Sequence, residues 1–100
     1  LPDRIKIALY YISQEAMNNV SKHAHATSVH VHFQSNPQGV KLQVADDGSG
    51  FDLSEVTPEH LGLGIMEERA DAIGAEFSIK STVGEGTETT VTWENPDHAN

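Results

Sequence analysis

Three polar residues near the end of the first helical segment have types and a spacing that could bind a metal–phosphate group. Glu15 and Asn19 are four residues apart and Lys22 follows three residues later, so we expect all three on one side of the last two helical turns. A carboxylate and an amide oxygen suit Mg²⁺, which takes hard oxygen ligands, and an ammonium group neutralises phosphate oxygens. The alternative interpretation is a solvated helix face with side-chain pairing along it.

A second stretch whose residue types could bind a ligand is Asp46–Asp47–Gly48–Ser49–Gly50, directly after a predicted strand. Two glycines two residues apart allow the backbone to pass close to a flat ligand. A carboxylate at a strand end can accept a hydrogen bond from the exocyclic amine of adenine, whereas the carbonyl oxygen of guanine would be repelled. The alternative is an ordinary Asp-Gly turn. A calcium loop is excluded because Gly48 stands where that motif needs an oxygen ligand.

Two further glycine motifs follow. Gly62–Leu63–Gly64–Ile65 leads into the second predicted helix, where free backbone N–H groups can bind an anion. It is not the dinucleotide fingerprint, because no strand precedes it and Glu67 occupies the third glycine position. Gly84–Glu85–Gly86–Thr87 is a hairpin turn when taken by itself. For both motifs the alternative is purely structural, a glycine-rich helix entry in one case and a tight turn in the other.

The elements that must position these motifs follow from hydrophobic periodicity. Ile5, Leu9, Ile12, Ala16 and Val20 form a helical stripe, and alternating apolar residues indicate strands. The predicted segments are a helix over residues 3–24, strands over 28–34 and 40–44, a helix over 63–73, and a hairpin made from 75–82 and 87–94. This order predicts an α+β fold, a two-layer sandwich in which helices cover one face of a mostly antiparallel sheet.

A long segment without periodicity, residues 46–61, is predicted to be a loop that acts as a lid over a ligand. Loops of this length in small domains are usually functional or mobile, so we expect residues 52–62 to be mobile without a ligand. The tail over 95–100 is expected to be disordered. Val29, Val31 and Phe33 are expected to form the buried side of a half-buried strand, and Ile65, Met66, Arg69, Ala72 and Ile73 are expected to share one side of the second helix.

Composition limits the function classes. One hundred residues allow a single domain over 1–100, which we interpret as a fragment of a longer protein. Only six Lys and Arg residues and a net charge of −9 argue against nucleic acid as a partner. The lack of Cys excludes disulfides, thiolate zinc sites and cysteine nucleophiles. The pairs His23/His25 and His30/His32 could chelate a metal, although exposed polar positions are the favoured interpretation.

The four motifs in this order and at these spacings resemble a known family. QEAMNNVSKHAHA resembles the N box, VADDGSGFD the G1 box, HLGLGIMEERADAIGA the G2 region and GEGTETTVTW the closing hairpin of the ATP-binding catalytic domain of sensor histidine kinases. That domain has the Bergerat fold of the wider ATPase group that includes gyrase, the ninety-kilodalton heat-shock chaperone and mismatch-repair MutL. The short lid and the residues that make up the boxes are most similar to the branch of the nitrate sensors and DesK. The resemblance covers nearly all of residues 8–93.

The resemblance implies a role for each matching residue, beginning with the phosphate end of the ligand. Asn19 is implied as the Mg²⁺ ligand that bridges to the triphosphate. Glu15 is implied to orient a metal-bound water or to act as a base. Lys22 and His23 are implied to hold phosphate or ribose oxygens. Catalytic roles are therefore expected for Glu15, Asn19 and Lys22.

At the purine end, the resemblance implies that Asp46 accepts the adenine N6 amine, with help from Thr87 through a water. The remaining implied contacts come from glycines and apolar residues: Gly48 and Gly50 admit the ring, Ala24 and Ile65 line its faces, and Gly62 and Gly64 let the lid close and present N–H groups. The resemblance leaves Asp47 and Arg69 without a chemical role.

The implied function is transfer of the γ-phosphate of Mg-ATP to a histidine on a separate dimerisation domain. A response regulator is implied as an indirect partner. The helices that carry such a histidine do not occur in this sequence. The isolated domain is expected to be a monomer, its parent a dimer, and its location cytoplasmic, while the sequence leaves membrane anchoring of the parent open. The alternatives are a nucleotide-binding docking module without catalysis, and a serine kinase or ATPase of the same group.

Overall fold

The computed structural model describes residues 1–55 and 62–97, without the side chains of His23 and Ala24. Its elements are α1 (Asp3–Asn19), the π-helical turn η1 (Val20–Ala24), β1 (Val29–Asn36), β2 (Gly39–Asp46), α2 (Leu63–Ala72), β3 (Glu76–Thr82) and β4 (Gly86–Glu94). This is the predicted order of helix, hairpin, loop, helix and hairpin. Residues 56–61 of the predicted lid and residues 98–100 of the predicted tail lie outside the described residues.

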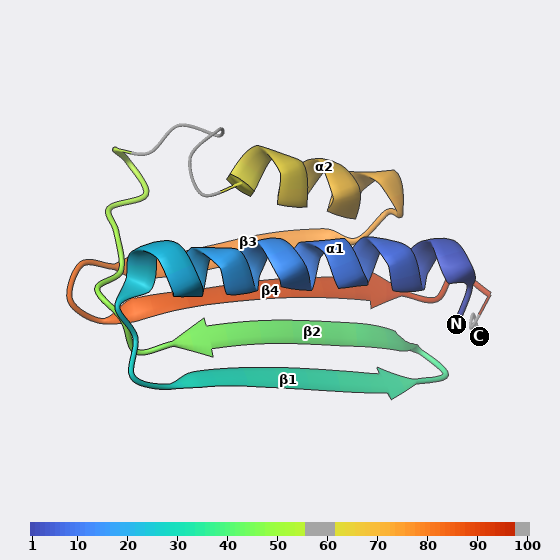
Figure 1. Cartoon of the computed structure of the whole chain (residues 1–100). Coiled ribbons are helices and arrows are strands. Elements are labelled where there is room, and N and C mark those ends of the chain that lie inside the picture. Colours follow the sequence, from blue (N-terminus) through green and yellow to red (C-terminus); the bar gives the residue numbers. More distant parts are fainter. Residues whose placement is uncertain (56–61, 98–100) are drawn as a thin grey trace.

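The strands form one sheet with the order β1-β2-β4-β3, in which every neighbouring pair is antiparallel. The two hairpins therefore meet along the β2–β4 pairing in the middle of the sheet. Both helices lie on the same face of this sheet (Figure 1). The predicted α+β two-layer sandwich is confirmed.

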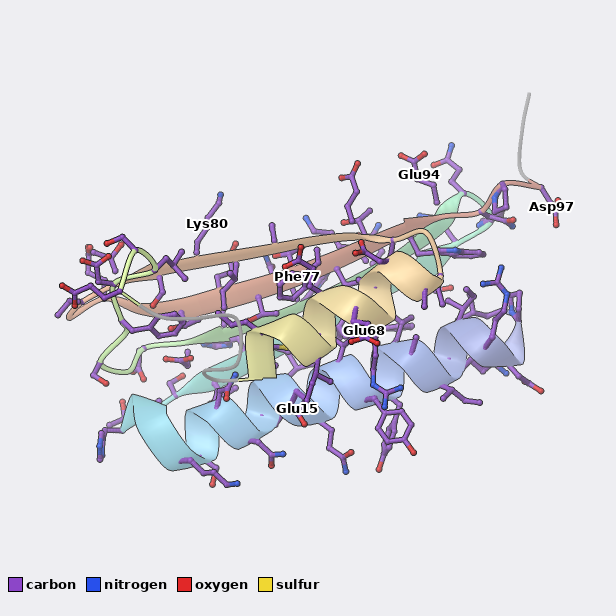
Figure 2. All side chains as sticks on the ribbon, turned by 90° about the horizontal axis from the view of Figure 1, so that it is seen from above. Glu15, Glu68, Phe77, Lys80, Glu94 and Asp97 are labelled. Atoms are coloured by element: carbon purple, nitrogen blue, oxygen red, sulfur yellow. The ribbon has the colours of Figure 1, made fainter. Side chains whose placement is uncertain are left out.

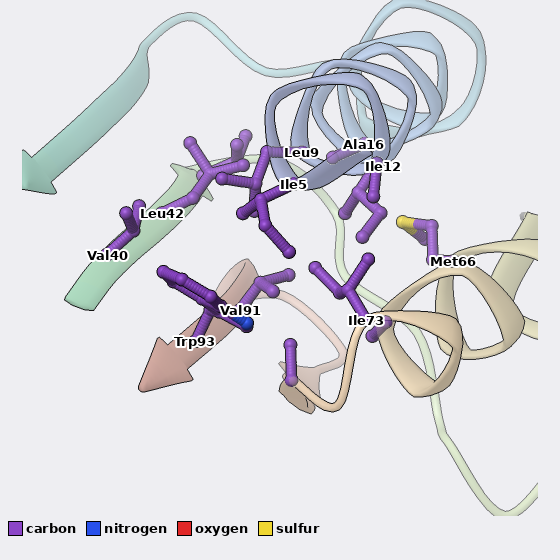
Figure 3. Close-up of a cluster of buried hydrophobic side chains, with 14 residues drawn as sticks. Ile5, Leu9, Ile12, Ala16, Val40, Leu42, Met66, Ile73, Val91 and Trp93 are labelled. Atoms are coloured by element: carbon purple, nitrogen blue, oxygen red, sulfur yellow. The ribbon is translucent and has the colours of Figure 1, made fainter. Parts of the chain in front are cut away.

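The hydrophobic core lies between the helices and the inner face of β2 and β4 (Figure 3). The predicted stripe of α1 supplies Ile5 and Ile12, and both are fully buried at 0% exposure. Met66 of α2 is also at 0%, and Val91 of β4 is at 1%. Full burial of a large aliphatic side chain contributes about 1.5–3 kcal/mol. The stripe thus holds α1 against the sheet, and this also fixes the position of the polar residues at the end of the helix.

The edge strand β1 departs from the prediction of a half-buried strand. Val31 and Phe33 remain 57% and 53% exposed, and Val29 is partly buried against the core. β1 is the outermost strand, and α1 packs on β2 instead. The alternation of apolar residues identified the inner face of this strand correctly, but a position at the sheet edge leaves that face uncovered.

The helices also differ in detail from the sequence prediction. α1 ends at Asn19, and the π-helical turn that follows closes at His25, whose φ of 52° is left-handed. In α2 the buried side consists of Met66 and Ala70, which continues into buried Ile73. The predicted members Ile65 and Ala72 are exposed. The i, i+4, i+7 spacing of the buried residues gives the correct helix phase.

The chain remains attached to the sheet beyond β4. The Asn95 N–H donates to the Gln38 carbonyl at 2.8 Å, and the Asn95 side-chain amide donates to the Pro37 carbonyl at 3.3 Å. The tail predicted from residue 95 is therefore anchored at its first residue. Among the described residues no helix is long and apolar enough to cross a membrane.

Candidate functional site

The predicted site residues gather at one end of the molecule. The end of α1, the end of β2 and the β3–β4 turn lie together at the left of Figure 1. The core packing of α1 and the β2–β4 pairing bring these three segments to the same place, although they are far apart in the sequence. This end of the fold is the candidate site.

A row of three polar residues crosses the sheet at this end. Asp46 of β2 pairs with Thr87 of β4, and Thr87 pairs with Ser81 of β3. Directly paired residues point to the same face of a sheet. In β4 that face also carries buried Val91 and Trp93, so the row points to the side where the helices lie. The structure thus brings Asp46 and Thr87, two of the predicted purine contacts, together and adds Ser81, which no sequence motif singles out.

The carboxylate of Asp46 is held by the glycine loop that follows it. One of its oxygens, Oδ1, accepts a hydrogen bond from the Gly48 N–H at 2.8 Å. Gly48 itself is buried and Asp46 is partly buried. This contact fixes the rotation of the carboxylate and with it the direction of the second oxygen.

The glycine loop also packs tightly against the β3–β4 hairpin. Gly50 has a φ of 63°, and a Cβ there would collide with the Thr82 carbonyl. Gly86 has a φ of 92°, and a Cβ there would collide with the Asp46 carbonyl. The Gly84 N–H donates to the Ser49 carbonyl at 2.6 Å. Close backbone approach therefore explains glycine at positions 50 and 86.

At the other side of the site, Glu15 of α1 lies close to the start of α2. A side chain at Gly62 would collide with the Glu15 carboxylate, and the left-handed φ of Gly62, 64°, also favours glycine. Glu15 lies on the side of α1 that faces α2 (Figure 2). The N-box carboxylate and the glycine motif of the second helix are thus neighbours. Gly64 follows in the first turn of α2, and Ile65 is 50% exposed.

The remaining predicted phosphate contacts lie where α1 changes into the π-helical turn. Asn19 is the last residue of α1 and is partly buried, whereas Lys22 lies in η1 and is exposed. The regular helical face predicted for Glu15, Asn19 and Lys22 therefore ends at Asn19. Single π-helical turns occur frequently at functional sites. The side chains of His23 and Ala24 lie outside the described residues.

Asp47 has a role that the sequence did not indicate. Its carboxylate accepts hydrogen bonds from the Thr27 N–H at 2.9 Å, the Thr27 hydroxyl at 2.7 Å and the Ser28 N–H at 2.9 Å. The Thr27 hydroxyl and then the Ser28 N–H hold the pKa of Asp47 below its ordinary value. Asp47 thus ties the segment after η1 to the loop after β2, which keeps the end of α1 beside Asp46.

A hollow of about 300 Å³ includes the row of polar residues in its lining. Its lining includes the row itself, Asp46, Ser81 and Thr87, and also Ala45, Lys80, Thr82 and Glu88, which alternate with the row along the strands. Alternate residues of a strand point to opposite faces. The hollow therefore takes its lining residues from both faces of the sheet, at the end where the candidate site lies.

Known proteins are similar to this chain in sequence. DegS of Brevibacillus brevis, a signal transduction histidine-protein kinase/phosphatase, is 34% identical over 86% of this chain and 22% of its own length. The sensor protein VraS of Staphylococcus aureus is 37% identical over 87% of this chain and 25% of its own length. The chain thus spans about a quarter of the length of these relatives.

Solved structures show the same fold. The ATP-binding domain of PrrB from Mycobacterium tuberculosis matches with a TM-score of 0.74 and 27% identity, over 90% of this chain and 68% of that one. The histidine kinase domain of a blue-light activated kinase from Erythrobacter litoralis matches with a TM-score of 0.72 and 23% identity, over 92% and 48%. The family of histidine kinase-, DNA gyrase B- and HSP90-like ATPases matches residues 5–97. With nearly its whole length inside that match, this chain belongs to the histidine kinase-, DNA gyrase B- and HSP90-like ATPases and is similar to the ATP-binding domains of sensor histidine kinases.

Proposed function

We propose that this domain binds Mg-ATP and donates the γ-phosphate to a histidine on a separate dimerisation and phosphoacceptor domain of its parent protein. The observation that carries the proposal is the position of Asp46 and Thr87 side by side at the same end of the fold as Glu15 and Asn19. Asp46 and Thr87 suit a purine edge, whereas Glu15 and Asn19 suit a metal-bound phosphate chain.

At the purine end, Asp46 accepts a hydrogen bond from the adenine amine. The Gly48 N–H holds Oδ1 at 2.8 Å and so directs the other oxygen. A carboxylate offers only acceptors when ionised, and adenine presents a donor at this edge whereas guanine presents an acceptor. Thr87, paired with Asp46 across the β2–β4 ladder, assists in this contact.

At the phosphate end, the donor set fits a magnesium ion that is shared with the nucleotide. Asn19 offers an amide oxygen, and Glu15, one helical turn before it, offers a carboxylate. Within residues 1–55 and 62–97, no three His, Asp or Glu side chains gather as a protein-only metal site. Mg²⁺ keeps several waters and uses one or two protein groups together with phosphates. When bound, the ion supplies neutralisation of the phosphate charge.

The chain's own contribution to transfer is positioning and local positive charge. Transfer of a phosphoryl group passes through a loose transition state, in which the protein mainly orients groups and neutralises charge. Lys22 lies within a stretch, residues 16–45, that contains no Asp or Glu although the chain carries 15 of them. This local lack of acids reduces the repulsion between a domain of net charge −9 and a polyanion. Lys22 is therefore assigned to the phosphate oxygens.

The first test is a calorimetric titration of the full chain with a non-hydrolysable ATP analogue and with the matching GTP analogue, each with and without Mg²⁺. We expect tighter binding of the ATP analogue and a gain in affinity with Mg²⁺. Equal affinity for the two nucleotides would contradict the assignment of Asp46.

The second test adds the phosphoacceptor domain of the parent protein to the chain and labelled ATP. We expect a phosphorylated product that is acid-labile and alkali-stable, as phosphohistidine is. The Glu15→Gln variant should lower the rate, whereas Glu76→Gln, at an exposed position of β3, should not. ATP binding without any labelled product would identify a docking module instead, and an acid-stable phosphoserine would identify a serine kinase.

A further inference from the structure

Ser81 connects the glycine loop, the hairpin and Thr87 through one hydroxyl group. Its Oγ accepts a hydrogen bond from the Phe51 N–H at 2.8 Å. It lies 2.8 Å from the Thr87 hydroxyl and can donate to the Gly86 carbonyl at 3.2 Å. Ser81 is partly buried. Of the three residues in the row across the sheet, Ser81 is the one farthest from Asp46.

The number of protons on the Ser81 hydroxyl decides whether the Thr87 hydroxyl acts as a donor or an acceptor toward Ser81. A serine hydroxyl has one proton to donate and two lone pairs that accept. If Ser81 donates to the Gly86 carbonyl and accepts from both Phe51 and Thr87, all three of its contacts are hydrogen bonds. If it donates to Thr87 instead, its bond to Gly86 is lost. The first arrangement makes one more hydrogen bond and is therefore favoured.

In that favoured arrangement the proton of Thr87 points to Ser81, and the Thr87 oxygen offers lone pairs to the site. Asp46, its direct neighbour in the ladder, also offers lone pairs. Together they form an edge with two acceptors, which suits an amino group with two N–H donors. A purine with a carbonyl oxygen at the same position meets two acceptors and no donor.

We propose that Ser81 is a specificity-determining residue, which fixes the Thr87 proton so that the site prefers a 6-amino purine to a 6-oxo purine. The proposal rests on the function proposed above and deepens it. Ser81 acts through Thr87 and is thus a positioning residue. Without Ser81, the Thr87 hydroxyl is free to turn and to donate to a carbonyl oxygen.

The test compares the affinities of the full chain for ATP and inosine triphosphate, which differ at the 6-position of the purine. In Ser81→Ala, we expect the preference for ATP over inosine triphosphate to fall by about three- to tenfold, the value of one hydrogen bond. Ser81→Thr keeps the hydroxyl and should retain the preference. Ser78→Ala, at an exposed position three residues earlier in the same strand, is the matched control.

A merely structural role gives a different result. Loss of the acceptor for the Phe51 N–H loosens the glycine loop, and both affinities then fall by the same factor, so an unchanged ratio in Ser81→Ala overturns the proposal. The double variant Ser81→Ala/Thr87→Val should show no further loss of preference beyond Thr87→Val alone, and an additive loss would also overturn it. If the unaltered chain binds neither nucleotide, the proposed function itself fails, which is a distinct outcome.

Discussion

At the scale of single residues, Asp46 is the group that we propose selects the nucleotide. In Asp46→Asn, the side-chain oxygen can keep the bond to the Gly48 N–H, and the introduced amide then directs its N–H donors toward the adenine amine. We expect ATP binding to weaken by about 1–3 kcal/mol because two donors face each other. Calorimetry measures the loss. Asp71→Asn, at an exposed position of α2, should bind as the unaltered chain does, and normal affinity in Asp46→Asn would contradict the prediction.

Asn19 is expected to separate catalysis from recognition of the base. In Asn19→Ala, the Asp46 contacts remain, whereas the amide oxygen proposed for Mg²⁺ is lost. Outer-shell partners of a bound metal are already worth about 10–100-fold in affinity or activity, so Mg²⁺-dependent phosphoryl transfer should fall at least that far. A transfer assay with the phosphoacceptor domain measures the effect, with Asn18→Ala as the control at the adjacent exposed position. Normal transfer by Asn19→Ala would remove Asn19 from the metal site.

At the scale of elements, Arg69 ties α2 to α1. Its guanidinium carbon lies 4.2 Å from the centre of the Tyr11 ring, and this ring meets Tyr10 edge-to-face at 5.5 Å. An exposed cation–π contact contributes about 0.5–1 kcal/mol, so Arg69→Gln should lower the free energy of unfolding by that amount in urea titrations. Tyr11→Phe keeps the ring and should remain close to the unaltered chain. An equal loss in both variants would show that the tyrosine hydroxyl, and not the ring face, carries the stabilisation.

The contact between the two hairpins can be tested with a matched pair of glycines. Gly84 and Gly86 have left-handed φ values of 85° and 92°, but a Cβ at Gly84 meets open space whereas one at Gly86 collides with the Asp46 carbonyl. Gly84→Ala should therefore cost only the backbone strain, about 1–2 kcal/mol. Gly86→Ala should cost more in urea unfolding and should also weaken ATP binding. If the two variants are equally stable, the close approach of β2 and β4 does not restrict this position.

At the scale of the whole molecule, Asp47 makes stability depend on pH. Hydrogen bonds from Thr27 and Ser28 lower the pKa of its carboxyl below the ordinary value of 3.8. Its contribution to stability is therefore complete above that value and is lost as the pH falls through the lowered pKa. Asp47→Asn should be less stable than the unaltered chain at neutral pH, and the difference should shrink in acid. Urea unfolding at both pH values measures it, and a difference that does not change with pH would contradict this role.

The sequence predicted the features that depend on local pattern. The apolar stripe of α1, the order of the elements and the position of Asp46 at a strand end are all encoded within short segments, because helical and strand periods can be counted along the chain. The exposure of Val31 and Phe33 could not be predicted in this way. It depends on which strand lies at the edge, and strand order is set by pairing between distant segments.

The same reason explains which site residues the sequence missed. Ser81 has no motif of its own, and only the register of β3 against β4 places it beside Thr87. Asp47 stands next to Asp46 in a recognisable motif, but its partners Thr27 and Ser28 precede β1 and become neighbours only in the folded chain. The roles proposed for Lys22 and for the glycines Gly62 and Gly64 remain predictions.

The pairing of β2 with β4 joins two halves of the chain that could be produced as separate peptides. Asp46 belongs to the half of the chain that carries α1, whereas Ser81 and Thr87 belong to the half that carries α2. Two separate peptides, one for each half, would each lack part of the proposed purine contact and should not bind nucleotide alone. Nucleotide added to their mixture would favour reassembly, since a ligand that binds only the joined form stabilises it by mass action. The β2–β4 pairing thus offers a basis for a split reporter of adenine nucleotides.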